Sequence, residues 1–423
     1  MGAYLSEPIT TKESSFGSGN RLEYGCSCMQ GWRQGMEDSH ITLPELQGSS
    51  LSLFGVFDGH GGREVAFFCR DHVPEEVSRL LQLTPGAASS TSPPRPTLDP
   101  ALLGESLKGA FHSVDRLLEK EEYAGEVRGH KEQDGRGGNL QQAQDALKAN
   151  VQESLNQAKD KGALSREDAM QLLMKMNVLK RFESQEQQGA AADNVGCTAV
   201  CVLISGSHYV CANAGDSRAV LCRAGRAVEL SYDHKPNDAT ERRRIEAAGG
   251  TIEETPVGTG PHARINYRIN GNLNLSRSIG DLQYKKRTDL PQEEQMICST
   301  PDIIVKQRSA DDEFLVIACD GIWDVKTNQQ ACDFVKARLD IKMPLHEIVE
   351  ELLNSCIAVD PKATFGLGGD NMTCIVVKVK GEGASSKGHA AEDIQPAVEL
   401  NLSKQDSEAK QPTGCFPFRC LRT

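Results

Sequence analysis

Short runs of apolar or alternating residues, each bounded by turn-forming residues, dominate the chain between positions 22 and 380. Such runs are typical of β-strands, and we predict strands at 22–30, 39–43, 51–57, 198–205, 208–213, 219–223, 227–230, 303–307, 313–319 and 372–378. Helical periodicity appears between groups of these strands and predicts helices at 63–82, 101–122, 239–248, 328–339 and 345–359. Because the strands come in consecutive blocks without regular β–α alternation, we expect antiparallel sheets with helices packed outside them.

Two stretches interrupt this pattern within a domain that we expect to span 21–380. Residues 84–100 are rich in Pro, Ser and Thr, which indicates a loop. Residues 125–193 form a long polar stretch with two amphipathic helix patterns, so we predict a helical insertion there. This insertion either packs on the main domain or serves as a docking surface.

The two ends of the chain have compositions typical of segments without a packed core. Residues 1–20 are rich in Ser, Thr and Gly, and we predict a flexible N-terminal segment. Residues 381–423 are dominated by small and charged residues, and we predict a disordered tail. The opening Met-Gly-Ala-Tyr-Leu-Ser matches the N-myristoylation pattern, which predicts weak, reversible membrane contact through an acylated Gly2.

Composition narrows the class of protein. The 423 residues are 38% hydrophobic and 25% charged, which is ordinary for a soluble globular protein. A net charge of -12 argues against nucleic-acid binding as the main task. We found no secretory signal and no apolar run long enough for a membrane span. The 14 cysteines are scattered, and we interpret them as reduced thiols of a cytoplasmic or nuclear protein.

Carboxylates recur where predicted strands end, next to Gly or Asn. The stretch around Asp58-Gly59-His60 follows a strongly apolar strand and contains three glycines within four residues. Four other stretches contribute acids in similar settings, namely Glu37 with Asp38, Asp216, Asp320 with Asp324, and Asp370. A single Asp at a strand end is usually a turn former, but five such stretches indicate a shared site.

This residue set suits metal-assisted hydrolysis of a phosphate ester. Carboxylates and a backbone carbonyl are the ligands that Mg²⁺ and Mn²⁺ prefer. Two such ions make hydroxide available near neutral pH, and it attacks phosphorus. Arg33 is suited to hold the phosphate, and His60 to protonate the leaving alkoxide. The alternatives are a surface ion pair of Arg33 with Glu37 and a simple turn hydrogen bond for His60.

Six motifs carry a specific resemblance to a known family. They are Met36-Glu37-Asp38, Asp58-Gly59-His60-Gly61-Gly62, Gly215-Asp216-Ser217-Arg218, Leu275-Ser276-Arg277-Ser278-Ile279-Gly280-Asp281, Cys319-Asp320-Gly321-Ile322-Trp323-Asp324 and Gly369-Asp370-Asn371. In this order they resemble the metal-dependent type 2C (PPM) Ser/Thr protein phosphatases. The opening Met-Gly-Ala-Tyr-Leu-Ser and the stretch Met29-Gln30-Gly31-Trp32-Arg33 resemble the gamma branch most closely. The resemblance implies an α+β fold, a four-layer α/β/β/α sandwich of two central antiparallel sheets flanked by helices.

The resemblance also assigns roles to individual positions around a binuclear centre. It implies that Asp58 bridges two metal ions and that the Gly59 carbonyl binds one of them. Asp320 and Asp370 are expected to complete this centre. Two ions per active site, Mg²⁺ or Mn²⁺, are therefore the implied cofactors.

Further positions follow from the same resemblance. Glu37 and Asp38 are expected to bind metal through water or to orient it, and Asp216 and Asp324 to hold a weaker third ion. Arg33 is the implied phosphate-binding residue and His60 the implied general acid. A flap is expected at 256–273.

The leading hypothesis is a phosphatase that acts on phosphoserine and phosphothreonine in proteins, as a monomer. Two other classes stay open at this point. One is a non-catalytic module that binds phosphoproteins, which the filled ligand set disfavours. The other is a metallohydrolase for small phosphoesters or nucleotides, which the absence of a nucleotide-cradling loop disfavours.

Overall fold

A computed structural model describes residues 4–83, 98–131, 151, 191–258 and 264–379. All of these residues fall within one compact unit, Met1–Ala384. Residues 84–97 of the predicted loop, most of the insertion at 125–193 and the predicted tail at 381–423 lie outside the described residues. Pro100, the last residue of the predicted loop, instead begins a helix. Among the described residues, no helix has the length and apolar character that a membrane crossing requires.

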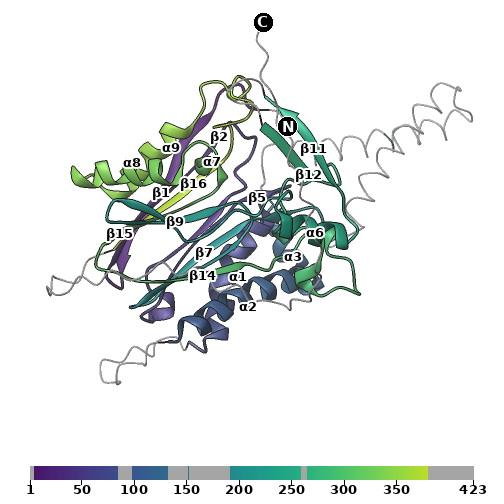
Figure 1. The fold of residues 1–423 in the computed structure, drawn as a ribbon, viewed down its shortest axis with the longest axis horizontal. Helices are drawn as coiled ribbons and strands as arrows, with labels where there is room; N and C mark the ends of the chain where they lie inside the picture. The colour runs from purple at the N-terminus through teal and green to yellow at the C-terminus, as the bar shows by residue number, and fades with distance from the viewer. Residues whose placement is uncertain (1–3, 84–97, 132–150, 152–190, 259–263, 380–423) are drawn as a thin grey trace, which may run out of the picture. The chain divides into compact units, whose positions relative to one another are not determined.

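Two antiparallel sheets form the centre of the domain (Figure 1). The first sheet has six strands, in the order β1 (Ile9–Gly19), β2 (Leu22–Gly31), β16 (Met372–Val379), β15 (Asp312–Ala318), β9 (Arg218–Arg223) and β10 (Arg226–Glu229). The second has five, in the order β14 (Asp302–Gln307), β8 (His208–Ala214), β7 (Ala199–Ile204), β4 (Ser52–Phe57) and β3 (Ser39–Leu43). Apolar side chains from both sheets, including Phe54 and Leu315, form one buried cluster between them.

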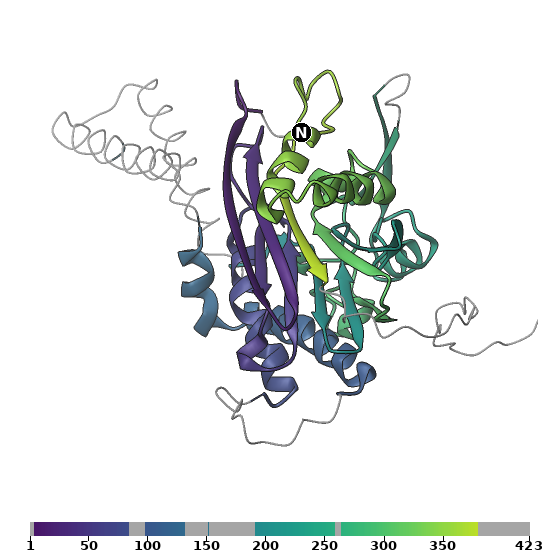
Figure 2. The same ribbon diagram turned by 90° about the vertical axis from the view of Figure 1, so that its left-hand side faces the viewer.

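Helices cover the outer face of each sheet, and Figure 2 shows this layering from the side. On the five-stranded sheet lie α1 (Glu64–Leu80), α2 (Pro100–Leu118) and α3 (Glu121–Gly129), which share a second buried cluster with it. On the six-stranded sheet, a third cluster joins α7 (Asp320–Trp323), α8 (Asn328–Asp340) and α9 (Leu345–Cys356). The predicted four-layer α/β/β/α sandwich is therefore confirmed.

Several short elements border one end of this sandwich. A small sheet consists of β13 (Ile279–Gly280), β6 (Gly196–Cys197) and β5 (Gly59–His60). The hairpin of β11 (Ile252–Val257) and β12 (Arg264–Ile269) lies where we expected the flap. The remaining elements are α6 (Ala239–Ala247) and the 3-10 turns η1 (Leu46–Gly48), η3 (Leu282–Tyr284) and η4 (Gln292–Glu294).

The prediction of a flexible segment at residues 1–20 is wrong for its second half. Residues Ile9–Gly19 form the edge strand β1, which pairs with β2 from Lys12 opposite Met29 to Gly19 opposite Leu22. The strand is mostly exposed, so its polar composition is compatible with the sheet because backbone hydrogen bonds hold it. A pattern search for apolar positions does not detect such a strand.

The core between the sheets leads to a stability prediction. Phe54 is fully buried there, whereas Phe16 on β1 is 69% exposed. We expect Phe54→Ala to lower the free energy of unfolding by about 3–5 kcal/mol, because it removes a buried ring and leaves a cavity. Phe16→Ala, the matched control, should cost less than about 1 kcal/mol. Urea unfolding measures both, and equal losses would contradict a core between the sheets.

Candidate metal centre and phosphate site

Three strand ends bring the predicted metal ligands together at one end of the sandwich. Asp58 lies between β4 and β5, Asp320 begins α7 two residues after the end of β15, and Asp370 stands two residues before β16. Strands β15 and β16 are neighbours, with Ala318 opposite Cys374. All three carboxyl-bearing residues are partly exposed, so the site is open to solvent on one side.

The acids lie close enough to Asp58 to change its pKa. The partial burial of Asp58 raises this pKa well above its ordinary range, and nearby negative charges raise it further. The residues that carry these charges are Asp38, Asp320, Asp370 and Asp216. The pKa of Asp320 is likewise raised, first by burial and then by Asp370. The structure thus brings together the acids that the sequence predicted to share a site.

Asp38 provides the most direct indication that a cation fits here. Its side chain is 3% exposed, and burial raises its pKa to about 7. One carboxylate oxygen accepts a hydrogen bond from the Thr373 hydroxyl at 2.7 Å, but the other is buried without a hydrogen-bond partner. Potential ligand atoms of Asp38, Asp58 and Cys319 lie within 4.8 Å of one another. Leaving a charged oxygen in this state is costly unless a cation compensates it.

The donor set favours a hard ion. Burial and nearby acids raise the pKa of Cys319 well above its ordinary value, so this sulfur stays a protonated thiol and a poor ligand. The remaining donors are carboxylate and carbonyl oxygens, which suit Mg²⁺ and Mn²⁺. The residues therefore fit the metal ions that the sequence predicted.

Glu37 and Gly59 pack against each other without room for a larger residue. A Cβ added at Gly59 would lie 2.3 Å from the Glu37 carbonyl oxygen, so only glycine allows this approach. The Glu37 amide donates to Asn371 Oδ1 at 2.9 Å, and Asn371 Nδ2 donates to the carbonyls of Gln30 and Gly35. Asn371 thus fixes the loop that carries Arg33, Glu37 and Asp38, a role that the sequence did not reveal.

The predicted third-ion residues are close to a lysine. Lys235 Nζ donates to Asp216 Oδ2 at 2.5 Å, and this carboxylate raises the pKa of Lys235 despite its burial. Burial raises the pKa of Asp324, and Lys235 partly opposes that shift. Sequence reasoning missed Lys235, because nothing in its own stretch indicates a partner 19 residues away.

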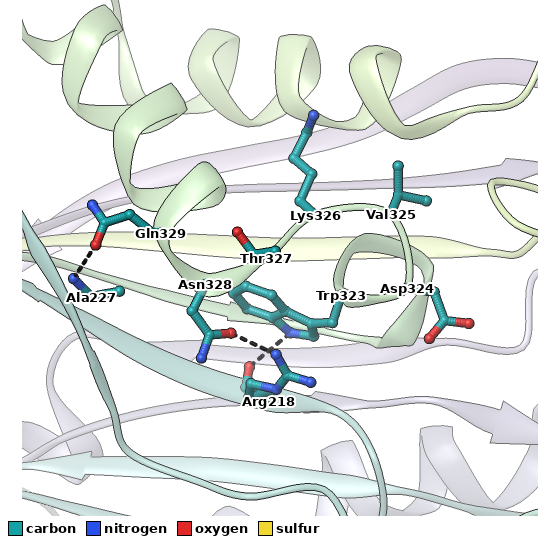
Figure 3. Close-up of a pocket in the computed structure, with 9 residues that line it drawn as sticks. All are labelled: Arg218, Ala227, Trp323, Asp324, Val325, Lys326, Thr327, Asn328 and Gln329. Atoms are coloured by element: carbon teal, nitrogen blue, oxygen red, sulfur yellow. Dashed lines mark hydrogen bonds between the residues drawn. The ribbon is translucent and has the colours of Figure 1, made fainter. Parts of the chain in front are cut away.

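Asp324 borders a cavity of about 520 Å³ beside α7 (Figure 3). Its wall includes Arg218, which forms a two-pronged ion pair with Asp233 at 2.9 Å, and Trp323. Trp323 Nε1 donates to the carbonyls of Arg218 and Ala318. These bonds fix the segment that follows Asp216.

Arg33 pairs with Asp370 rather than with Glu37, the partner in the alternative that the sequence left open. Burial would lower the pKa of this guanidinium, but Asp370, Asp320 and Asp58 raise it. Arg33 is still 48% exposed and lies at the edge of the acidic cluster. It is therefore available to a group that approaches from solvent.

His60 forms a dyad with Asp281. Its Nε2 lies 2.7 Å from Asp281 Oδ2, which also accepts the Ser278 hydroxyl at 2.5 Å. Burial would lower the pKa of His60, but the Asp281 carboxylate raises it above the ordinary value. The sequence placed Asp281 in a family motif without giving it a role, because the two residues are 221 positions apart.

A buried ion pair supports this dyad from the helical layer. Asp115 Oδ1, on α2, accepts a hydrogen bond from Lys285 Nζ at 2.8 Å, and both side chains are at most 4% exposed. Asp115 Oδ1 also accepts the Gly280 amide at 2.9 Å, while Lys285 Nζ donates to the Ser278 carbonyl at 2.9 Å. The segment before Asp281 is thus held by hydrogen bonds from outside the site.

Comparison with known proteins agrees with this geometry. Residues 22–95 and 104–364 match the family model described as Protein phosphatase 2C. The chain belongs to the protein phosphatase 2C family. A probable protein phosphatase 2C of Oryza sativa subsp. japonica is 37% identical over 380 residues, 90% of this chain and 91% of the relative. Protein phosphatase 2C homolog 2 of Schizosaccharomyces pombe is 35% identical, over 90% of this chain and 80% of the relative.

Solved structures support the fold. A Toxoplasma gondii phosphatase has a TM-score of 0.54 at 19% identity, covering 87% of this chain and 95% of its own. A serine-threonine phosphatase 2C from the same organism also has a TM-score of 0.54, at 17% identity, with 89% and 98% covered. The family membership confirms that this chain is a metal-dependent Ser/Thr protein phosphatase, with phosphoproteins as its class of substrate. Closest similarity to the gamma branch stays a prediction.

Because the acids repel one another, we predict that removing one of the charges stabilises the metal-free protein. In protein stripped of divalent ions, Asp58→Asn should raise the melting temperature, because a neutral amide relieves the repulsion around position 58. Adding Mn²⁺ should stabilise the wild type strongly and this variant weakly. Calorimetry in EDTA and in Mn²⁺ measures both effects. A variant that is less stable than wild type in EDTA would contradict the charge argument.

Proposed function

We propose that the acidic cluster would hold two Mg²⁺ or Mn²⁺ ions, with Asp58, Asp320, Asp370 and the Gly59 carbonyl as their ligands. The observation that carries this proposal is the convergence of charge on Asp58 next to an unpartnered oxygen of Asp38. Glu37 and Asp38 lie beside the cluster and orient water around the ions. When bound, such ions supply a water of lowered pKa and neutralise phosphate charge.

Arg33 binds the phosphate of the substrate. Without a bound cation, its guanidinium compensates Asp370. If Asp370 bound a cation, Arg33 would be released from this ion pair, and its planar fork would be suited to two parallel hydrogen bonds with phosphate oxygens. Its exposed position at the cluster edge supports this role.

His60 acts as the general acid. A protonated imidazole can give its proton to the serine or threonine oxygen that leaves phosphorus. Asp281 favours this protonated form and fixes the ring orientation through Nε2. The other nitrogen, Nδ1, is buried without a partner among the described residues, so it is the position from which a proton can pass to the substrate.

Asp216 and Asp324 form a weaker third ion site. Lys235 already compensates Asp216 through a 2.5 Å hydrogen bond, so a cation must compete with this ammonium group. The same competition explains why this site should fill only at higher metal concentrations.

The oligomeric state and cellular location of the protein are proposed from its sequence. We propose a monomer in the cytoplasm or nucleus, with weak membrane contact if Gly2 is acylated. A single acyl chain gives marginal, reversible binding. Loss of membrane partitioning in Gly2→Ala tests the acylation.

Metal ligation gives a direct activity prediction. Hydrolysis of a phosphothreonine peptide should require Mg²⁺ or Mn²⁺ and should stop in EDTA. Asp320→Asn should lower kcat by at least about 10³-fold, because it removes a ligand of the catalytic ions. Asp311→Asn, on an exposed turn, is the control and should retain wild-type activity. Activity that persists in EDTA would refute the proposal, and faster turnover of nucleotides than of peptides would indicate a different substrate class.

The dyad predicts a shift in the pH profile. General acid activity requires protonated His60, so kcat should fall as pH rises through its pKa. Asp281 raises this pKa, and Asp281→Asn should therefore move the decline to lower pH as well as reduce kcat. Steady-state assays between pH 5 and 9 measure the profile, with melting temperature as the control for folding. An unchanged alkaline limb would exclude His60 as the titrating acid.

A further inference from the structure

The N-terminal residues before β1 lie against the loop that carries Arg33. The Leu5 amide donates to the Trp32 carbonyl at 3.0 Å, directly before Arg33 in the chain. Trp32 is itself fixed, because its Nε1 donates to the Ala358 carbonyl at 2.8 Å. The residue before Leu5 is therefore held next to the proposed phosphate site, although β1 itself runs away along the sheet edge.

That residue is Tyr4, and it packs on the glycine-rich loop before Asp370. A Cβ added at Gly366 would lie 3.2 Å from the Tyr4 hydroxyl oxygen, and one at Gly369 would lie 3.1 Å from ring atom Cε1. Gly366 also has a φ of +98°, a conformation that favours glycine. The loop thus leaves space that the phenol ring occupies.

Charged groups surround the phenol. Burial raises the pKa of Tyr4, and the charges of Arg33, Asp370 and Arg264 also act on it. Arg264 lies at the start of β12 and donates through Nη2 to the Phe365 carbonyl at 2.9 Å. The phenol is therefore near the proposed phosphate-binding arginine and near a second arginine from the hairpin.

The hydroxyl of Tyr4 has no hydrogen-bond partner within the part of the chain that the structure describes, and the residue is only partly buried. A phenol is a good neutral donor, and phosphate oxygens are strong acceptors. A donor beside Arg33 adds a hydrogen bond to the phosphate without adding another charge to the site.

We propose that the Tyr4 hydroxyl donates a hydrogen bond to the substrate phosphate bound by Arg33, so the N-terminal segment forms part of the substrate-binding wall. This inference rests on the proposed role of Arg33. The inference adds the N-terminal segment to the substrate site, although this segment precedes all six family motifs in the chain. The alternative is a packing role, in which Tyr4 only supports the loop before Asp370.

Tyr4→Phe in the full chain separates the two, because it removes the hydroxyl and keeps the ring. We expect the inhibition constant of inorganic phosphate and the KM for p-nitrophenyl phosphate each to rise about tenfold, with kcat changed less than about twofold. Calorimetric titration of inorganic phosphate into Mn²⁺-loaded protein should show the same weakening without turnover. The control Glu7→Gln changes an exposed residue of the same segment and should match wild type.

Three results would overturn the inference. The first is unchanged phosphate binding in Tyr4→Phe. The second is a change in the Mn²⁺ concentration for half-maximal activity with unchanged phosphate inhibition, which would mean that Tyr4 acts through the Asp370 loop. The third is a lower melting temperature of Tyr4→Phe with no change in either KM or phosphate inhibition. A wild-type protein without metal-dependent activity would instead refute the proposed function, so the two failures are distinguishable.

Discussion

The mutual repulsion of carboxylates around Asp58 is the constraint on which this structure depends. Two like charges 4 Å apart repel by about 4 kcal/mol at an effective dielectric constant of 20. Four neighbouring acids raise the pKa of Asp58 in this way. The fold tolerates this repulsion because two sheets with a shared apolar core hold the strand ends in place. Metal binding turns the same repulsion into affinity, since a divalent cation replaces it with attraction.

Around this cluster, polar side chains fix the reacting groups from distant parts of the chain. Asn371 ties the Arg33 loop to β16, Lys235 compensates Asp216, and Asp281 orients His60. The pair of Asp115 and Lys285 anchors the Asp281 segment to α2. The Asp115–Lys285 pair links the Asp281 segment to the helix α2, so a small displacement of this helix would be transmitted to the site.

The sequence predicted the architecture well because its strands are apolar runs ended by Gly, Asn or Asp. It also predicted the acids, because each follows or precedes such a run, and their meeting at one end of the sandwich agrees with the shared site expected for Asp58, Asp320 and Asp370. It missed β1, whose polar residues face solvent while backbone bonds hold the strand. It also missed the partners of known residues, such as Asp281 for His60, because pairing across 221 positions leaves no local pattern.

The most direct test of the central claim is an anomalous-scattering map from crystals grown with Mn²⁺. The account predicts two peaks about 3.5–4 Å apart, with the Asp58 carboxylate between them and Asp320 and Asp370 in contact with the ions. A third, weaker peak near Asp216 would agree with competition by Lys235. A single peak, or peaks that do not contact Asp58, would contradict the account.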